Sequence, residues 1–119
     1  MLNRKVGILG GSFDPPTISH LQLASEALNV LKFDEIWMVP CGTRTDKNLT
    51  CAPQQRLEMV NKAIDDYFPR GYPVKVNDIE VQNGEMIPTY FLMKQLEQKY
   101  GPEFKFYFIL GSDLVPTLI

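Results

Sequence analysis

Residues 5–20 read KVGILGGSFDPPTISH, a short apolar run followed by a glycine pair and a polar turn. The apolar run from Lys5 to Gly10 predicts a buried parallel strand that enters a tight turn. After the turn, apolar residues recur at helical spacing and predict a helix from Ile18 to Leu31, with Thr17 as its N-terminal cap. The glycine pair therefore joins a strand to a helix.

The same alternation of strand and helix continues along the chain. Three further strands are predicted, at Glu35 to Val39, Val74 to Val76 and Phe104 to Leu110. Two further helices are predicted to begin at Pro53 and at Pro88-Thr89. Strands that alternate with helices indicate right-handed crossovers on a parallel sheet. The predicted fold is therefore a single α/β domain over residues 1–119, a Rossmann-like sheet of four parallel strands with helices on both faces.

The composition excludes several classes of protein. The 119 residues carry a formal charge of -2 and 45% of them are hydrophobic, so no broad positive field can gather nucleic acid or an anionic membrane. No stretch approaches the roughly 18 apolar residues that span a bilayer, and the N-terminus does not resemble a signal peptide. Cys41 and Cys51 lack the spacing and the nearby histidine of a zinc site. We therefore expect a cytoplasmic or nuclear protein whose phosphate binding is local.

The glycine turn and the histidine that follows it are the first candidate site. Gly10 and Gly11 carry no side chains, so backbone N–H groups can approach an anion at the N-terminus of the next helix. The pattern is neither GxGxxG nor GxxxxGK[ST], and a simple strand-to-helix turn is the alternative interpretation. His20, the only histidine in the chain, shares a helix face with Thr17. Its imidazole is suited to donate a proton or a hydrogen bond to charge on a leaving phosphate group.

A second polar loop is expected to face the glycine turn. Gly111-Ser112-Asp113 follows the fourth predicted strand directly. In open parallel sheets, ligands bind beyond the carboxyl ends of the strands, at the point where the strand order reverses. The loops after the first and fourth strands are therefore predicted to border one ligand site.

The stretch Gly10 to His20 resembles the G-x-F-x-P-x-[HT]-x-G-H motif of the nucleotidyltransferase superfamily. Four further features occur in the order that this superfamily shows, and the GSD and PTY segments resemble those of nicotinate or nicotinamide mononucleotide adenylyltransferases. They are Lys47, Arg56 followed by Met59, Pro88-Thr89-Tyr90, and Gly111-Ser112-Asp113. The resemblance implies transfer of AMP from ATP to the mononucleotide by direct attack on the α-phosphorus, with Mg²⁺ carried by the triphosphate. It leaves open whether the acid or the amide mononucleotide is preferred.

The resemblance also implies a role for each matching residue. Thr17, His20 and Lys47 are the expected catalytic residues, with Thr17 and His20 holding the ATP phosphates and Lys47 neutralising phosphate charge. The expected ATP-binding and phosphate-binding residues are Gly10, Gly11, Ser12, Phe13, His20, Gly111 and Asp113. The expected mononucleotide-binding residues are Ser12, Phe13, Lys47, Arg56 and Thr89.

Simpler interpretations exist for two of these residues. Lys47 lies in a polar run that is typical of a solvated loop. Arg56 is equally suited to an ion pair on a helix surface, where it would contribute little.

Two departures from the superfamily pattern affect these expectations. Ser19 stands where the motif usually has glycine, although serine is small enough to allow the same close approach. The chain also ends at Leu118-Ile119, before the fifth strand and the I-S-x-T-x-x-R segment of the family. We therefore expect a truncated domain that binds ATP weakly, with the strand Phe104 to Leu110 as an exposed edge through which copies associate. The alternatives are another adenylyltransferase or cytidylyltransferase, for example of phosphopantetheine, and a non-catalytic nucleotide-binding module.

Overall fold

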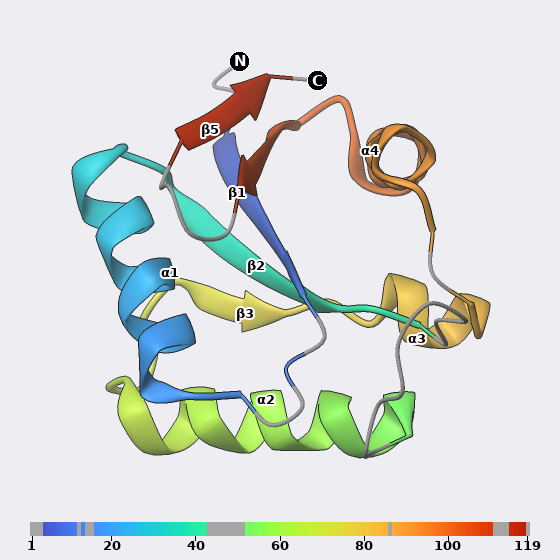
Figure 1. The fold of residues 1–119 in the computed structure, drawn as a ribbon. Helices are drawn as coiled ribbons and strands as arrows, with labels where there is room; N and C mark the ends of the chain where they lie inside the picture. The colour runs from blue at the N-terminus through green and yellow to red at the C-terminus, as the bar shows by residue number, and fades with distance from the viewer. Residues whose placement is uncertain are drawn as a thin grey trace.

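A computed structural model describes residues 4–11, 13, 16–42, 52–85, 87–110 and 115–118, which form one sheet with helices on both faces (Figure 1). The four predicted strands are present and parallel. They are β1 (Arg4–Gly11), β2 (Glu35–Pro40), β3 (Val74–Val76) and β4 (Phe104–Leu110). The sheet order is β3-β2-β1-β4-β5, so β1 pairs with both β2 and β4. The strand order therefore reverses between β1 and β4, as predicted.

The outer edge of the sheet differs from the prediction. A fifth strand, β5 (Val115–Leu118), pairs antiparallel with Tyr107 to Leu110. The prediction that β4 forms an exposed apolar edge is therefore wrong for these residues, because the chain turns back and pairs with its own last strand. Self-association stays a prediction, but the edge that suggested it is covered along this half of β4.

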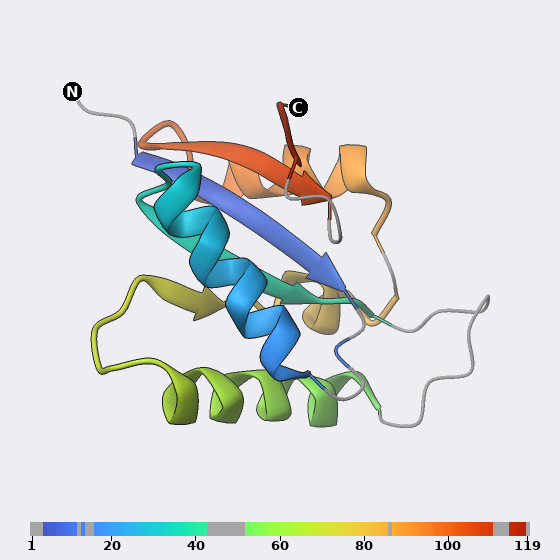
Figure 2. The same cartoon turned by 60° about the vertical axis from the view of Figure 1, so that its left-hand side comes forward.

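The helices cover both faces of the sheet, as predicted. Helices α1 (Ile18–Val30) and α2 (Pro53–Tyr67) pack on one face, and α3 (Ile79–Asn83) and α4 (Thr89–Tyr100) pack on the other. Figure 2 shows α1 in front of β1 and β2, with α4 behind the sheet. The short helix α3 was not predicted, because its five residues are too few for a periodic apolar stripe. Among the described residues, no helix has the length and apolar character needed to cross a membrane.

Each face of the sheet has its own hydrophobic core. The alternation of side chains along β1 sends Leu9 to the α1 face, and Val6 and Ile8 to the α4 face. The α1-face core continues through Leu21, Ala24, Leu28, Val60 and Ile64, and the α4-face core through Trp37, Ile87, Leu92, Met93 and Leu96. Each helix thus buries one apolar face, although Tyr67 at the end of α2, which the helical spacing also places in a buried stripe, is 42% exposed. These two cores hold the strands in register, so that β1 and β4 end side by side.

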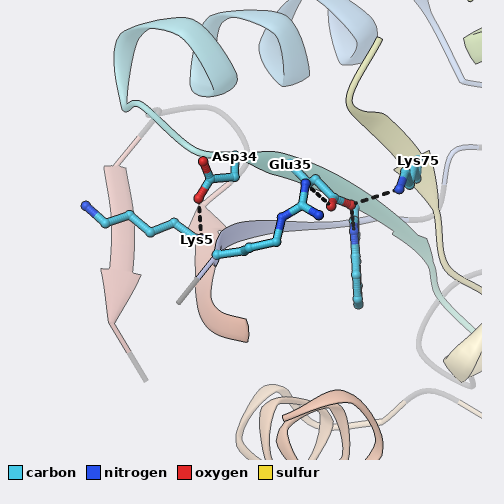
Figure 3. A network of polar contacts seen from close by, with 6 residues as sticks. Lys5, Asp34, Glu35 and Lys75 are labelled. Atoms are coloured by element: carbon cyan, nitrogen blue, oxygen red, sulfur yellow. Dashed lines mark hydrogen bonds and ion pairs between the residues drawn. The ribbon is translucent and has the colours of Figure 1, made fainter. Parts of the chain in front are cut away.

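A polar network joins the strands at the opposite end of the sheet, where β1 and β2 begin. Glu35 forms ion pairs with Arg4, at 2.8 Å, and with Lys75, at 3.2 Å. Figure 3 shows Glu35 and Lys75 side by side. The carboxylate of Glu35 is buried and also accepts a 2.9 Å hydrogen bond from Nε1 of Trp37. Both cations are more than half exposed, so solvent screens their charge. The buried bond to Trp37 is therefore the stronger contribution of Glu35.

We predict that Glu35→Ala lowers the free energy of unfolding by about 1–3 kcal/mol, because Trp37 Nε1 is left buried without its acceptor. Urea unfolding measures the change. Trp37→Phe removes the donor and keeps an aromatic ring, so combining it with Glu35→Ala is expected to cost less than the sum of the two single changes. If the losses in the free energy of unfolding of the two single variants simply added in the double variant, the hydrogen bond would contribute nothing to stability.

Candidate functional site

Two cavities open on either side of the end of β1. The larger, of about 470 Å³, lies on the α1 face and the smaller, of about 220 Å³, lies on the α4 face. Gly10 and Gly11 line both. The larger cavity is completed by Leu9, Phe13, Ser19, His20 and Leu23, and the smaller by Cys41, Glu80, Ile87, Pro88, Thr89, Leu92 and Phe108. The glycine pair thus lies between two neighbouring cavities.

The two glycines meet different surroundings. A Cβ at Gly11 would lie 3.3 Å from the ring of Phe13, which is a tight contact on the side of the larger cavity. A Cβ at Gly10 would lie 3.5 Å from Phe108, an ordinary contact on the side of the smaller cavity. Packing within the protein alone therefore does not require glycine at position 10. Close approach of a ligand to the backbone is a physical reason for glycine there.

Phe13 combines an unusual backbone with a buried side chain. Its φ of 50° lies in the left-handed region, which is costly for a residue with a Cβ atom. Its ring is 3% exposed and packs edge-on against the imidazole of His20, with 5.0 Å between the ring centroids. Strained backbone of this kind persists where surrounding contacts enforce it, and it occurs often at functional sites. Phe13 thereby restricts the orientation of His20.

His20 lies in the first turn of α1, and its ring is tied to the residue that caps the helix. Nδ1 accepts a 2.9 Å hydrogen bond from the backbone N–H of Thr17, and the hydroxyl of Thr17 lies 3.2 Å from the same nitrogen. This is the arrangement of a capping box, with imidazole in place of the usual glutamate or glutamine. The prediction that Thr17 caps the helix and lies beside His20 is confirmed.

The hydrogen bond at Nδ1 decides which tautomer His20 adopts. Since Nδ1 is the acceptor, the proton of the neutral ring lies on Nε2, which can donate to a ligand. Partial burial lowers the pKa of His20 below its ordinary 6.5. Protonation of Nδ1 would also break the bond from Thr17, which favours the neutral ring in the same direction. Near neutral pH, His20 therefore presents an uncharged N–H donor at the larger cavity.

The wall of the smaller cavity contains a buried carboxylate. Oε1 of Glu80 accepts hydrogen bonds from the backbone N–H groups of Gly42 and Ile87, each at 3.2 Å. Thr89, predicted to border the mononucleotide, is the first residue of α4 and lines the same cavity. The sequence prediction did not include Glu80. The available signal was a charged residue between Ile79 and Val81, which no local pattern distinguishes from a surface position.

Arg56 has a different environment from the one predicted for a surface residue. Its side chain is 0% exposed, and the guanidinium donates to Sγ of Cys41 at 3.4 Å and to the carbonyl of Gly42 at 3.3 Å. The interpretation as a surface ion pair is therefore wrong. Arg56 does not line either cavity, and its contacts support the segment that follows β2.

The structure brings together some of the predicted residues and leaves others outside the described ranges. Gly10, Gly11, Phe13 and His20 surround the larger cavity, where Ser19 also lies. Thr89 lies at the smaller cavity with the same glycines. The predicted residues that lie outside the described residues are Ser12, Lys47, Gly111 and Asp113. In the described part of the chain, no three histidine, cysteine, aspartate or glutamate side chains converge as metal ligands.

The chain is similar to known proteins over nearly its whole length. The profile of the cytidylyltransferase-like family matches residues 8–118. A probable nicotinate-nucleotide adenylyltransferase from Oceanobacillus iheyensis is 38% identical over 116 residues, which are 97% of this chain and 58% of that protein. One from Bacillus licheniformis is 37% identical over 119 residues, which are 97% of this chain and 59% of that protein.

A solved structure is similar over nearly the same residues. The nicotinic acid mononucleotide adenylyltransferase of Plasmodium falciparum, complexed with NaAD, superposes with a TM-score of 0.77 at 36% identity. The match covers 94% of this chain and 54% of that one. The chain thus spans a little more than half of the length of each of these relatives.

Proposed function

The chain belongs to the cytidylyltransferase-like family, and we propose that within it the protein transfers AMP from ATP to nicotinate mononucleotide, or to its amide, and releases pyrophosphate. The names of its relatives support an adenylyl transfer to a pyridine mononucleotide. The observation that carries the proposal is the position of His20, a neutral N–H donor beside a glycine pair that borders two cavities.

The two cavities support a division of the site between the two substrates. We assign the phosphates of magnesium–ATP to the larger cavity, beside His20, and the pyridine mononucleotide to the smaller cavity, beside Thr89. An oxygen of the mononucleotide 5′-phosphate bonds to the α-phosphorus of ATP, and pyrophosphate leaves with the electrons of the broken P–O bond. The two reacting groups would meet at Gly10 and Gly11, where no side chain blocks their approach.

The residues of the chain supply positioning and electrostatic stabilisation to this reaction. Nε2–H of His20 donates a hydrogen bond to phosphate charge that increases as pyrophosphate leaves. The N-terminus of α1 adds the partial positive charge of its backbone N–H groups. Direct contacts from Ser12, Lys47, Gly111 and Asp113 remain predictions, as does an intracellular location.

Pyrophosphate release with magnesium–ATP tests the proposal. The assay compares nicotinate mononucleotide, nicotinamide mononucleotide and phosphopantetheine as acceptors, and we expect release with a pyridine mononucleotide only. Release with phosphopantetheine alone would retain the superfamily and reject the substrate. Calorimetric binding of the mononucleotide without any release, even at high magnesium–ATP, would favour a nucleotide-binding module.

The lowered pKa of His20 predicts a pH-dependent contribution to stability. In the unfolded chain the ring titrates near its ordinary 6.5, so below that pH the unfolded state binds more protons than the folded state. The stabilisation from neutral His20 is therefore complete above pH 6.5 and is lost as the pH falls through the lower, folded value. Urea unfolding of the wild type and His20→Asn between about pH 5 and 8 measures it. The stability advantage of the wild type is expected to shrink toward acid, and an advantage that grew there would contradict the assigned pKa direction.

A further inference from the structure

Glu80 joins two segments of the chain that form the wall of the smaller cavity. Gly42 lies 38 residues before Glu80 and follows β2, whereas Ile87 lies seven residues after it and precedes α4. One carboxylate oxygen accepts from both backbone N–H groups, at 3.2 Å each. Glu80 is 5% exposed, so these two hydrogen bonds form where solvent competes little for the groups that make them. The separation of the two segments therefore depends on the length of the Glu80 side chain.

The backbone of Gly42 is held by two side chains. Its N–H donates to Glu80, and its carbonyl accepts from Arg56 at 3.3 Å. Its Cα packs directly against the backbone of Glu85, which lies between α3 and α4. A Cβ at Gly42 would be 2.5 Å from the carbonyl carbon of Glu85. A carboxylate and a guanidinium from different helices thus clamp Gly42 by its backbone N–H and by its carbonyl.

The contacts of Glu80 lie beside the smaller cavity and not beside the larger one. Glu80 and Ile87 line the smaller cavity, as does Cys41, which precedes Gly42, and none of these residues lines the larger one. A change in the reach of residue 80 would therefore shift the wall of the smaller cavity and leave the phosphate side unchanged. A small, flat ligand bound between two such segments is sensitive to their separation, since a displacement of about 1 Å can cost on the order of 100-fold in rate.

We propose that Glu80 is a positioning residue for the mononucleotide: through Gly42 and Ile87, its carboxylate sets the width of the cavity that receives the pyridine ring. The inference rests on the proposed function, because it assigns that cavity to the mononucleotide. The proposed action of Glu80 depends on the length of the side chain and on its capacity to accept both hydrogen bonds. Arg56 supports the same wall through its hydrogen bond to the carbonyl of Gly42.

Two substitutions separate length from charge. Glu80→Gln keeps the length and an oxygen that accepts both N–H groups, whereas Glu80→Asp keeps the charge but is shorter by one methylene group. Calorimetry measures the dissociation constants for nicotinate mononucleotide and for magnesium–ATP. We expect Glu80→Asp and Glu80→Ala to weaken mononucleotide binding about 10- to 100-fold. We expect Glu80→Gln to stay within about threefold of the wild type, and ATP binding to change little in all three variants.

Glu35→Ala is the matched control, because Glu35 is also a buried, hydrogen-bonded glutamate but lies at the opposite end of the sheet. Glu35→Ala should lower the free energy of unfolding without selectively weakening the binding of the mononucleotide. The proposal is overturned if Glu80→Asp binds the mononucleotide as the wild type does, if Glu80→Gln is as weak as Glu80→Ala, or if both ligands weaken equally.

Amide hydrogen exchange separates failure of this inference from failure of the proposed function. Exchange at Gly42 and Ile87 should accelerate in Glu80→Asp and remain slow in Glu80→Gln, whatever ligand the cavity takes. A wild-type protein that binds no pyridine mononucleotide would overturn the proposed function, and with it the assigned ligand. Binding that persists unchanged in Glu80→Asp, despite faster exchange, would overturn the positioning role alone.

Discussion

Replacing His20 with alanine is expected to lower the rate of pyrophosphate release about 100- to 1,000-fold, which is the usual effect of removing one donor that stabilises transition-state charge. The imidazole is held by Thr17 at Nδ1 and by the ring of Phe13, so its Nε2–H is oriented before substrate arrives. Because charge on the phosphates increases as the reaction proceeds, the loss should appear mainly in kcat. Steady-state kinetics with magnesium–ATP and nicotinate mononucleotide measure it.

A second variant distinguishes catalysis from helix capping. In His20→Asn the amide oxygen lies near the position of Nδ1 and can accept from the N–H of Thr17, but no donor remains at the position of Nε2. His20→Asn is expected to keep most of the stability that the helix cap supplies. Its rate of pyrophosphate release should fall as far as that of His20→Ala. If His20→Asn retained the full rate, the N–H donor would have no catalytic role.

Gly42→Ala is expected to lower the free energy of unfolding by on the order of 1–3 kcal/mol or more, the usual cost of forcing extra atoms into a packed site. The added Cβ would meet the carbonyl carbon of Glu85 at 2.5 Å and its oxygen at 2.6 Å. These are backbone atoms, which cannot turn aside as the end of a side chain can. The segment after β2 should therefore move away from Glu80 and disturb the smaller cavity. Urea unfolding and calorimetry with nicotinate mononucleotide measure the two effects.

Gly71→Ala is the matched control for this change. Gly71 has a φ of 86° and nothing within 4 Å of an added Cβ, so alanine there strains the backbone without a collision. It should cost roughly 1–2 kcal/mol of stability and leave mononucleotide binding unchanged. Equal effects of both variants on binding would show that the contact of Gly42 with Glu85 does not shape the cavity.

Local patterns were sufficient to predict the main elements of the fold. The stripe that begins at Leu21 and the apolar runs before Gly10 and after Phe104 follow the helix and strand periods, so each could be assigned within a short window. The helix α3 and strand β5 could not be assigned in this way. One has five residues and the other four, and β5 is defined by pairing with β4 rather than by its own pattern.

Some features of the candidate site could likewise be predicted from local patterns, and others could not. The proximity of Thr17 and His20 follows from a spacing of three residues in one helical turn. The position of Gly10 and Gly11 beside the cavities follows from their place at the end of β1. The burial of Arg56 could not be predicted, because its position on α2 is equally compatible with solvent. Glu80 was missed for the same reason.

By itself, the sequence determined an α/β sheet, a glycine turn, and a helix with Thr17 as its cap and His20 beside it, because each of these depends on neighbours within a few residues. Only the tertiary structure decided that β4 is covered by β5, that the glycine pair separates two cavities, and that Glu80 and Arg56 clamp Gly42. The physical reason is distance along the chain. The bond from Gly42 to Glu80 joins residues 38 apart, and it depends on the packing that places β2 and α3 side by side.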